Sequence, residues 1–270
     1  MHWKRWVTAL VALPFLFLLI IKGGALLFTV AVFLVSIISL WEYFRIVFKE
    51  QHFPVPFAVE VWTYAAAAGI AFSIYGQSLR TVLAVLIVHL LGAACFSIFR
   101  FKNSQDAPLV ALKQAFGLLY IPLLLSFLIR FYLQPDGVHW VLWVLLVVAA
   151  GDTGAFYVGS YLGKHKLCPA VSPKKTIEGA LGGLAANVII GTLYQMLFIP
   201  SLSLAMGIVF AIVVGAVGQA GDLFESEFKR AADVKDSGKL LPGHGGFLDR
   251  IDALLFAAPI AFLLKDYLLP

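Results

Sequence analysis

The sequence predicts an all-α integral membrane protein with about nine transmembrane helices. Hydrophobic residues make up 61% of the 270 residues, charged residues only 13%, and the mean hydropathy is +0.93. Soluble domains carry about twice this share of charge, so this much apolar surface is stable only against lipid. No segment alternates apolar and polar residues as a membrane β-strand does, and isolated spans must therefore be helices.

Nine apolar segments approach or exceed the length that crosses about 30 Å of hydrocarbon. They lie at about residues 7–21, 24–47, 57–75, 80–99, 108–131, 138–162, 177–199, 203–228 and 251–268. The first is short, contains Pro14 and has the basic start of a signal peptide. It ends in Lys22-Gly23-Gly24 without a small-residue cleavage site, so we expect it to be retained as a helix.

The basic residues predict the side of the membrane on which each loop lies. With the N-terminus inside, sixteen of the 20 Lys and Arg residues fall on the inner side, in loops or at the ends of spans, and four fall on the outer side, as the positive-inside rule expects. We expect a cytoplasmic N-terminus, a C-terminus on the opposite side, and a multi-pass protein of the cell (inner) membrane. Residues 1–135 would form about five spans and residues 136–270 about four. The second group carries the longest polar loops, both on the cytoplasmic side, so we expect the chemistry of the protein there.

The excess of basic over acidic residues does not predict nucleic-acid binding. The net charge of +5 and the pI of about 9.2 are explained by the membrane topology. The two cysteines, Cys95 and Cys168, are too few for a disulfide framework and lack the spacing of metal ligands. We interpret both as packing residues.

Two carboxylates, Asp152 and Asp222, lie within predicted spans. A charge at the centre of a membrane helix costs about 3 kcal/mol on insertion scales, and such residues usually face the bundle interior and serve function. The alternative is a helix-packing hydrogen bond from a protonated aspartic acid, helped at Asp152 by the neighbouring glycines Gly151 and Gly154.

Asp222 also begins a polar stripe. It is followed at helical spacing by Glu225, Ser226, Lys229 and Arg230, so these side chains share one face of a helix. We expect that face to turn toward a water-filled cavity. An ion-paired surface helix is the alternative, although the leucine and phenylalanines between these positions favour lipid.

The longest polar stretches are two inside loops at about residues 163–176 and 229–250. In the first, Lys174 and Lys175 could bind phosphates near a helix N-terminus, and Pro173 and Thr176 indicate an ordered turn. The alternative is a basic loop that only sets the topology.

In the second loop, three glycines allow backbone N–H groups to approach an anion: Gly243, Gly245 and Gly246. Asp249 and Asp252 follow one helical turn apart. Mg²⁺ is usually held by one or two carboxylates together with phosphate oxygens. Basic residues beside such carboxylates are typical of phosphoryl or nucleotidyl transfer.

The run from Ser226 to Asp252 resembles the motif of the phosphatidate cytidylyltransferases, also called CDP-diacylglycerol synthases. The matching residues are Ser226, Lys229, Arg230, Lys235, Asp236, Pro242, His244, Gly245, Gly246, Asp249, Arg250 and Asp252. Segments 151–163 and 172–179 also resemble blocks of that family, whereas the first five spans resemble it only in hydropathy and order.

The resemblance implies transfer of CMP from CTP to phosphatidic acid, which gives CDP-diacylglycerol and pyrophosphate, in an all-helical and commonly dimeric protein. It implies Mg²⁺, and a second cation is an open alternative. The metal ligands would be Asp222 and Asp249, followed by Asp252 and Asp152. The catalytic residues would be Asp249, Asp222, Lys229 and Arg230. Substrate-binding residues would be Lys174, Lys175, Glu178, Ser226, Lys235, His244, Gly245, Gly246 and Arg250.

Two other functions are weighed against this one. A membrane transporter of an organic anion would use Asp152 and Asp222 as coupling sites, but it leaves the cluster of acids, bases and glycines unexplained. A CDP-alcohol phosphotransferase would carry its Asp-Gly-x-x-Ala-Arg string, which does not occur in this sequence.

Overall fold

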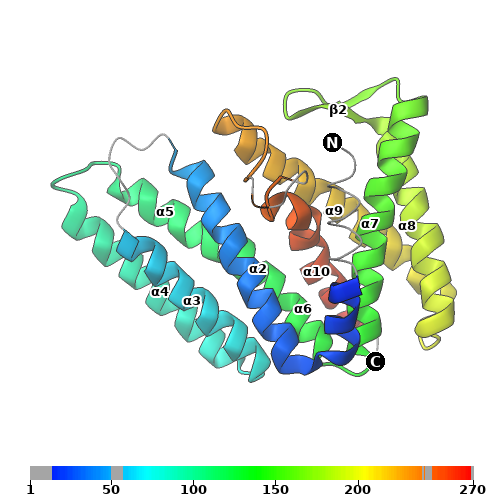
Figure 1. The fold of residues 1–270 in the computed structure, drawn as a ribbon, viewed down its shortest axis with the longest axis horizontal. Helices are drawn as coiled ribbons and strands as arrows, with labels where there is room; N and C mark the ends of the chain where they lie inside the picture. Colours follow the sequence, from blue (N-terminus) through cyan, green and yellow to red (C-terminus); the bar gives the residue numbers. More distant parts are fainter. Residues whose placement is uncertain (1–13, 50–56, 239, 241–244, 269–270) are drawn as a thin grey trace. The chain divides into compact units, whose positions relative to one another are not determined.

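The computed structural model describes residues 14–49, 57–238, 240 and 245–268, and helices dominate it (Figure 1). Residues 14–22 are helical. The elements that follow are α2 (Gly24–Val47), α3 (Phe57–Tyr75), α4 (Leu79–Arg100), α5 (Ala107–Leu118), η1 (Leu119–Leu123), α6 (Leu124–Tyr132), α7 (Gly137–Leu162), β1 (Lys166–Cys168), β2 (Ser172–Thr176), α8 (Ile177–Phe198), α9 (Leu204–Ala231) and α10 (Leu248–Leu268).

The prediction of an all-helical integral membrane protein is confirmed. Seven helical stretches of the described residues are long and apolar enough to cross a membrane. The first expected span, 7–21, lies partly outside the described residues. The last, α10, is helical but is not among the seven, because charged residues at both of its ends leave only residues 253–264 without a charge. The count of nine spans stays a prediction.

The chain divides into two compact units. Unit 1 comprises Met1–Arg130 and Ala231–Asp249, and unit 2 comprises Phe131–Arg230 and Arg250–Pro270. The polar segment that follows α9 therefore packs with the N-terminal helices. The division predicted from the sequence, at residues 135 and 136, stays a prediction.

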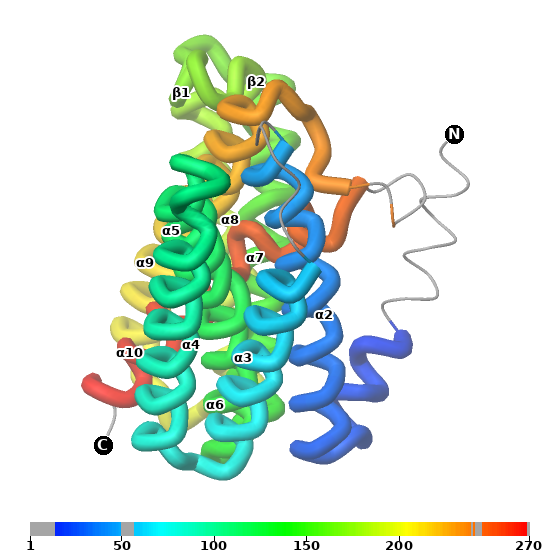
Figure 2. The backbone as a smooth tube through the Cα atoms, turned by 90° about the vertical axis from the view of Figure 1, so that its left-hand side faces the viewer, coloured from blue at the N-terminus to red at the C-terminus, as the bar shows by residue number. Residues whose placement is uncertain are grey.

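Unit 1 is built on α2, α3, α4 and α5, which lie side by side (Figures 1 and 2). The buried ring of Tyr43 packs against Phe116 of α5, and its hydroxyl donates to the carbonyl of Lys113 at 3.1 Å. The buried ring of Phe44 packs against Tyr64 of α3. Between α3 and α5, the side-chain amide of Gln114 donates to Thr63 Oγ1 at 2.9 Å. Interhelical hydrogen bonds of this kind satisfy polar groups that water does not reach.

The span Ala107–Tyr132 is interrupted by Pro122. Proline has no backbone N–H and its ring collides with the preceding turn of an α-helix. The chain accommodates it in a five-residue π-helical turn, Leu119–Leu123, between α5 and α6. The helix therefore continues across the proline instead of ending there.

Unit 2 is built around α7 and α8, which pack closely along their length. Small residues make this approach possible: a Cβ on Gly154 would lie 2.6 Å from that of Ala186, and one on Gly182 would overlap Val158. Such contacts are typical of helix pairs in membranes. The indole of Trp143 also donates to the carbonyl of Gly191 at 2.9 Å.

The first polar loop is an antiparallel hairpin, β1 paired with β2, that connects α7 to α8 (Figure 1). Thr176 ends β2 and caps α8, because its Oγ1 accepts from the N–H of Gly179 at 3.1 Å. A threonine N-cap satisfies one of the unpaired N–H groups at the start of a helix. The ordered turn predicted at Pro173 and Thr176 therefore takes the form of this hairpin.

Candidate active site

A cavity of about 360 Å³ lies in unit 2 between α7, the hairpin, α8 and α9. It is lined by four of the residues singled out in the sequence: Asp152, Lys174, Lys175 and Asp222. Carboxylates from two helices, α7 and α9, thus meet lysines of β2 in the first polar loop. Phe156 and Leu167 add an apolar part to the lining, so the cavity presents both charge and hydrocarbon to a ligand.

Lys175 and Asp222 form an ion pair across this cavity. The ammonium nitrogen of Lys175, on β2, lies 2.5 Å from Oδ2 of Asp222, on α9. The two side chains are 30% and 26% exposed, so water and ligands can reach both. Each could therefore exchange its partner for a phosphate or a cation without uncovering a buried charge.

Asp152 lies on α7 and its side chain is exposed. It lines the same cavity, and no hydrogen bond joins its carboxylate to another described side chain or backbone group. The alternative of a helix-packing hydrogen bond therefore receives no support. The carboxylate is available to a ligand.

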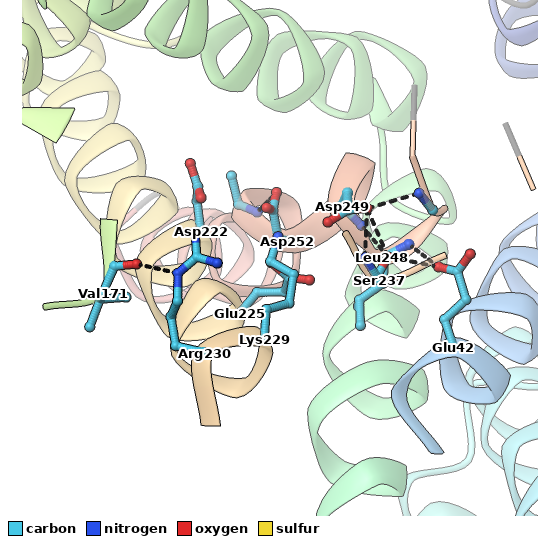
Figure 3. Close-up of polar contacts among 12 residues, drawn as sticks. Glu42, Val171, Asp222, Glu225, Lys229, Arg230, Ser237, Leu248, Asp249 and Asp252 are labelled. Atoms are coloured by element: carbon cyan, nitrogen blue, oxygen red, sulfur yellow. Dashed lines mark hydrogen bonds and ion pairs between the residues drawn. The ribbon is translucent and has the colours of Figure 1, made fainter. Parts of the chain in front are cut away.

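The polar stripe of α9 divides into residues with different surroundings. Only Asp222 lines the cavity. Glu225, Ser226 and Lys229 are buried, and Lys229 forms an ion pair with Glu225 one turn away. Arg230 is exposed, and its Nε donates to the carbonyl of Val171 in the hairpin at 3.1 Å (Figure 3).

Asp252 adds a further carboxylate in unit 2. It lies in the first turns of α10, where its Oδ1 accepts from the N–H of Ala253 at 2.7 Å. The charges of Asp222, Glu225 and Asp152 are near enough to repel its carboxylate. Close packing holds it there, because a Cβ on Gly221 of α9 would lie 2.7 Å from the Asp252 carbonyl.

These carboxylates suit a cation that is held only partly by protein. Among the described residues, no group of three or more His, Cys, Asp or Glu side chains is arranged to hold a metal ion. Mg²⁺ does not need such a group, because it takes one or two carboxylates together with substrate phosphates and water. Asp222, together with Asp152 or Asp252, supplies the two carboxylates that such a site needs.

Glu178 supports the hairpin. It lies in the first turn of α8 and accepts hydrogen bonds from the backbone N–H groups of Lys164 and His165 at 3.0 and 3.2 Å. The Nδ1 of His165 lies 2.6 Å from its other oxygen. Glu178 therefore fastens the chain that leaves α7 to the start of α8, and it does not line the cavity.

In unit 1, Asp249 organises the end of the second polar loop. Its Oδ2 accepts from the N–H of Gly246 at 2.8 Å and from the N–H and hydroxyl of Ser237, each at 3.0 Å. Gly245 has a φ of +82°, a conformation that favours glycine. His244, predicted to bind substrate, lies outside the described residues, as do Lys239 and Gly243.

Two further predicted residues, Lys235 and Arg250, are exposed. Lys235 lines a second cavity, of about 750 Å³, within unit 1. Arg45 of α2 and Lys49, in the turn that follows α2, also line it, and Lys49 donates to the carbonyl of Ala232 at 2.8 Å. The segment that contains Lys235 is therefore tied to the end of α2.

The sequence analysis missed Glu42, which is fully buried in α2. Its Oε2 accepts from the N–H of Leu248 at 2.8 Å and from the hydroxyl of Ser237 at 3.1 Å (Figure 3). The sequence alone could have indicated Glu42, because a carboxylate within an apolar span is a candidate functional residue. The longest polar loops, however, lie in the second half of the chain, far in sequence from Glu42.

Comparisons with known proteins give consistent results. The sequence model described as the cytidylyltransferase family matches residues 3–268. The chain is 33% identical over 262 residues to a phosphatidate cytidylyltransferase of Staphylococcus saprophyticus, which covers 96% of this chain and 97% of the relative. The corresponding protein of Staphylococcus aureus strain COL is 33% identical over 263 residues, with the same coverage of both chains. That of Staphylococcus haemolyticus is 43% identical over 140 residues, which cover 52% of this chain and 54% of the relative.

Proposed function

Because the chain belongs to the cytidylyltransferase family, we propose that it is a phosphatidate cytidylyltransferase, which transfers CMP from CTP to phosphatidic acid. The products are CDP-diacylglycerol and pyrophosphate, so the enzyme acts in phospholipid biosynthesis. The observation that carries this proposal is the cavity of unit 2, where Asp152 and Asp222 meet Lys174 and Lys175. The alternative of an anion transporter has no support among the relatives, which are phosphatidate cytidylyltransferases.

The cavity matches the two substrates in chemistry. Lysines from the hairpin suit the phosphates of CTP and of phosphatidic acid, and the carboxylates suit a cation that accompanies the triphosphate. Phe156 is 66% exposed and lies beside the charged groups. It therefore offers an apolar surface to the glycerol and the first methylene groups of a lipid.

Mg²⁺ would be held by Asp222 with Asp152 or Asp252. The family motif also implies Asp249 as a metal ligand, and this stays a prediction. A second cation is compatible with this number of carboxylates. When bound, the ion neutralises charge on the triphosphate and on the pyrophosphate that leaves. Lys175 would then be released from Asp222 to a phosphate oxygen.

The reaction needs no strong base on the protein. The phosphate monoester of phosphatidic acid has a second pKa of about 6, so at neutral pH its oxygen is already a nucleophile. That oxygen forms a bond to the α-phosphorus of CTP, while the bond from the α-phosphorus to the bridging oxygen of the β-phosphate breaks. Catalysis then consists of positioning and of charge neutralisation, which Lys174, Lys175 and Arg250 would supply.

The same proposal includes the finer topology. Nine spans would place the N-terminus and both polar loops in the cytoplasm and the C-terminus on the opposite side, in the inner membrane. The excess of Lys and Arg in those loops supports this orientation. The enzyme would act as a homodimer, as the family resemblance implies, and nucleic acid would not be a partner.

The test is an assay of the purified full-length chain in lipid nanodiscs with CTP, phosphatidic acid and Mg²⁺. We expect pyrophosphate and CDP-diacylglycerol in equal amounts, and no product when Mg²⁺ is replaced by EDTA. Phosphatidylglycerol is the matched control, because its phosphodiester lacks the dianionic oxygen that attacks. Absence of pyrophosphate in the complete mixture, with protein that remains folded, would refute the proposed function.

A further inference from the structure

Glu42 is an acidic residue completely buried within an apolar helix. It lies in α2 and is 0% exposed. Removing a carboxylate from water costs several kcal/mol unless strong hydrogen bonds replace the water. Here they come from one segment far along the chain: the N–H of Leu248 and the hydroxyl of Ser237 both lie within hydrogen-bonding distance of Oε2.

The contact with Leu248 fixes the point at which α10 begins. The first N–H groups of an α-helix have no partner within the helix, and Leu248 is the first residue of α10. Glu42 supplies the missing acceptor from a different helix. The contact therefore ties the start of α10 to α2.

The contact with Ser237 connects Glu42 to Asp249. The Ser237 hydroxyl oxygen lies 3.1 Å from Oε2 of Glu42 and 3.0 Å from Oδ2 of Asp249. The N–H of Asp249 in turn donates to that hydroxyl oxygen at 3.3 Å. The Ser237 hydroxyl thus lies within hydrogen-bonding distance of both carboxylates, and its single hydrogen donates to one of them at a time (Figure 3).

Two glycines provide the space for this arrangement. A Cβ on Gly238 would overlap the carboxylate of Glu42, and one on Gly246 would overlap the hydroxyl of Ser237 and lie 2.5 Å from Oε2 of Glu42. Gly246 also donates its N–H to Asp249 at 2.8 Å. Gly238 and Gly246, from two parts of the second polar loop, thus pack against the Glu42 carboxylate.

We propose that Glu42 is a positioning residue for cytidylyl transfer, which holds the start of α10 and, through Ser237, orients the carboxylate of Asp249, the metal ligand that the family motif implies. This rests on the proposed function. Stability alone does not explain a buried acid at this position. The carboxylates of Glu42 and Asp249 share the Ser237 hydroxyl, and their negative charges repel each other, which costs stability.

The test compares the full-length enzyme with the variant Glu42→Gln, which keeps the shape of the side chain but removes its charge. An amide is a weaker acceptor than a carboxylate, so we expect kcat to fall about tenfold, equivalent to about 1.4 kcal/mol. The Mg²⁺ concentration for half-maximal rate should rise. The melting temperature should change little, and amide hydrogen exchange should become faster in residues 245–249.

Ser36→Ala is the matched control. Ser36 is also buried in α2, but its hydroxyl donates to the carbonyl of Val32 in its own helix at 2.8 Å. This variant should match the wild type in kcat, in Mg²⁺ dependence and in hydrogen exchange.

Ser237→Ala tests the connection through the hydroxyl. If Glu42 acts through Ser237, the double variant Glu42→Gln/Ser237→Ala should lose little more kcat than the more impaired single variant, because the two residues act as one unit. Independent losses that multiply would refute the connection.

The remaining outcomes separate the two proposals. A normal kcat per folded molecule in Glu42→Gln, with or without a lower melting temperature, would overturn the positioning role. A wild-type protein that does not consume CTP would refute the proposed function instead. In that case hydrogen exchange would still test whether Glu42 holds the start of α10. Unchanged exchange of residues 245–249 in Glu42→Gln would show that it does not.

Discussion

Lys175 of the hairpin and Asp222 of α9 form an ion pair, with 2.5 Å between the ammonium nitrogen and the carboxylate oxygen. They are separated by 47 residues in the chain and come from a polar loop and an apolar helix. Both line the cavity of unit 2. Each therefore neutralises the other at the place where a nucleotide and its cation would bind.

Replacing Lys175 should weaken the binding of CTP. In Lys175→Met we expect the KM for CTP to rise at least tenfold, by roughly 1.4 kcal/mol or more, because a charge-assisted contact to phosphate is lost. Steady-state kinetics with varied CTP measures this. Lys166→Met is the control, since Lys166 is an exposed residue of β1 that does not line the cavity. An unchanged KM in Lys175→Met would remove Lys175 from the CTP site.

Replacing Asp222 should abolish turnover but leave the fold intact. In Asp222→Asn we expect kcat/KM to fall at least about 100-fold, because a ligand of the cation is lost. The partly exposed pair with Lys175 contributes at most about 1 kcal/mol to stability, so the melting temperature should change little. Glu227→Gln, at an exposed position of α9, should behave as wild type. Near-normal activity of Asp222→Asn at all Mg²⁺ concentrations would exclude Asp222 as a metal ligand.

The buried pair of Glu225 and Lys229 should be important for stability. Removing one partner of a buried ion pair costs about 3–5 kcal/mol, because the remaining charge loses its nearest counter-charge. We therefore expect Lys229→Met to melt at a lower temperature than the wild type, measured by the loss of the monodisperse peak after heating in detergent. The double variant Glu225→Leu/Lys229→Met should recover part of the loss. A double variant less stable than Lys229→Met would contradict this interpretation.

Glu178 should influence CTP binding indirectly, by holding the hairpin in place. In Glu178→Gln the backbone N–H groups of Lys164 and His165 lose a charged acceptor, so we expect faster proteolytic cleavage within residues 163–176 and a severalfold rise in the KM for CTP. Limited proteolysis followed by mass spectrometry measures the first effect. Glu60→Gln on α3 is the control, because Glu60 interacts with Tyr64 of its own helix. Equal cleavage rates for Glu178→Gln and wild type would show that Glu178 does not hold the hairpin.

The sequence by itself determined the class of the protein and the segments that carry its chemistry. Hydropathy over about 20 residues is a local property, and it decides whether a helix is stable in lipid. Spacing along one helix is local too, so the shared stripe from Asp222 to Arg230 followed from helical periodicity. The motif between Ser226 and Asp252 likewise indicated the family that the comparisons support.

Only the tertiary structure decided which of these groups meet. Lys175 was predicted to bind phosphate, and its pairing with Asp222 depends on how the hairpin folds over α9. Glu42 and Ser237 are 195 residues apart, and no periodicity connects them. Such contacts arise when helices pack and polar groups must find partners away from water, so they depend on the whole fold and not on any one segment.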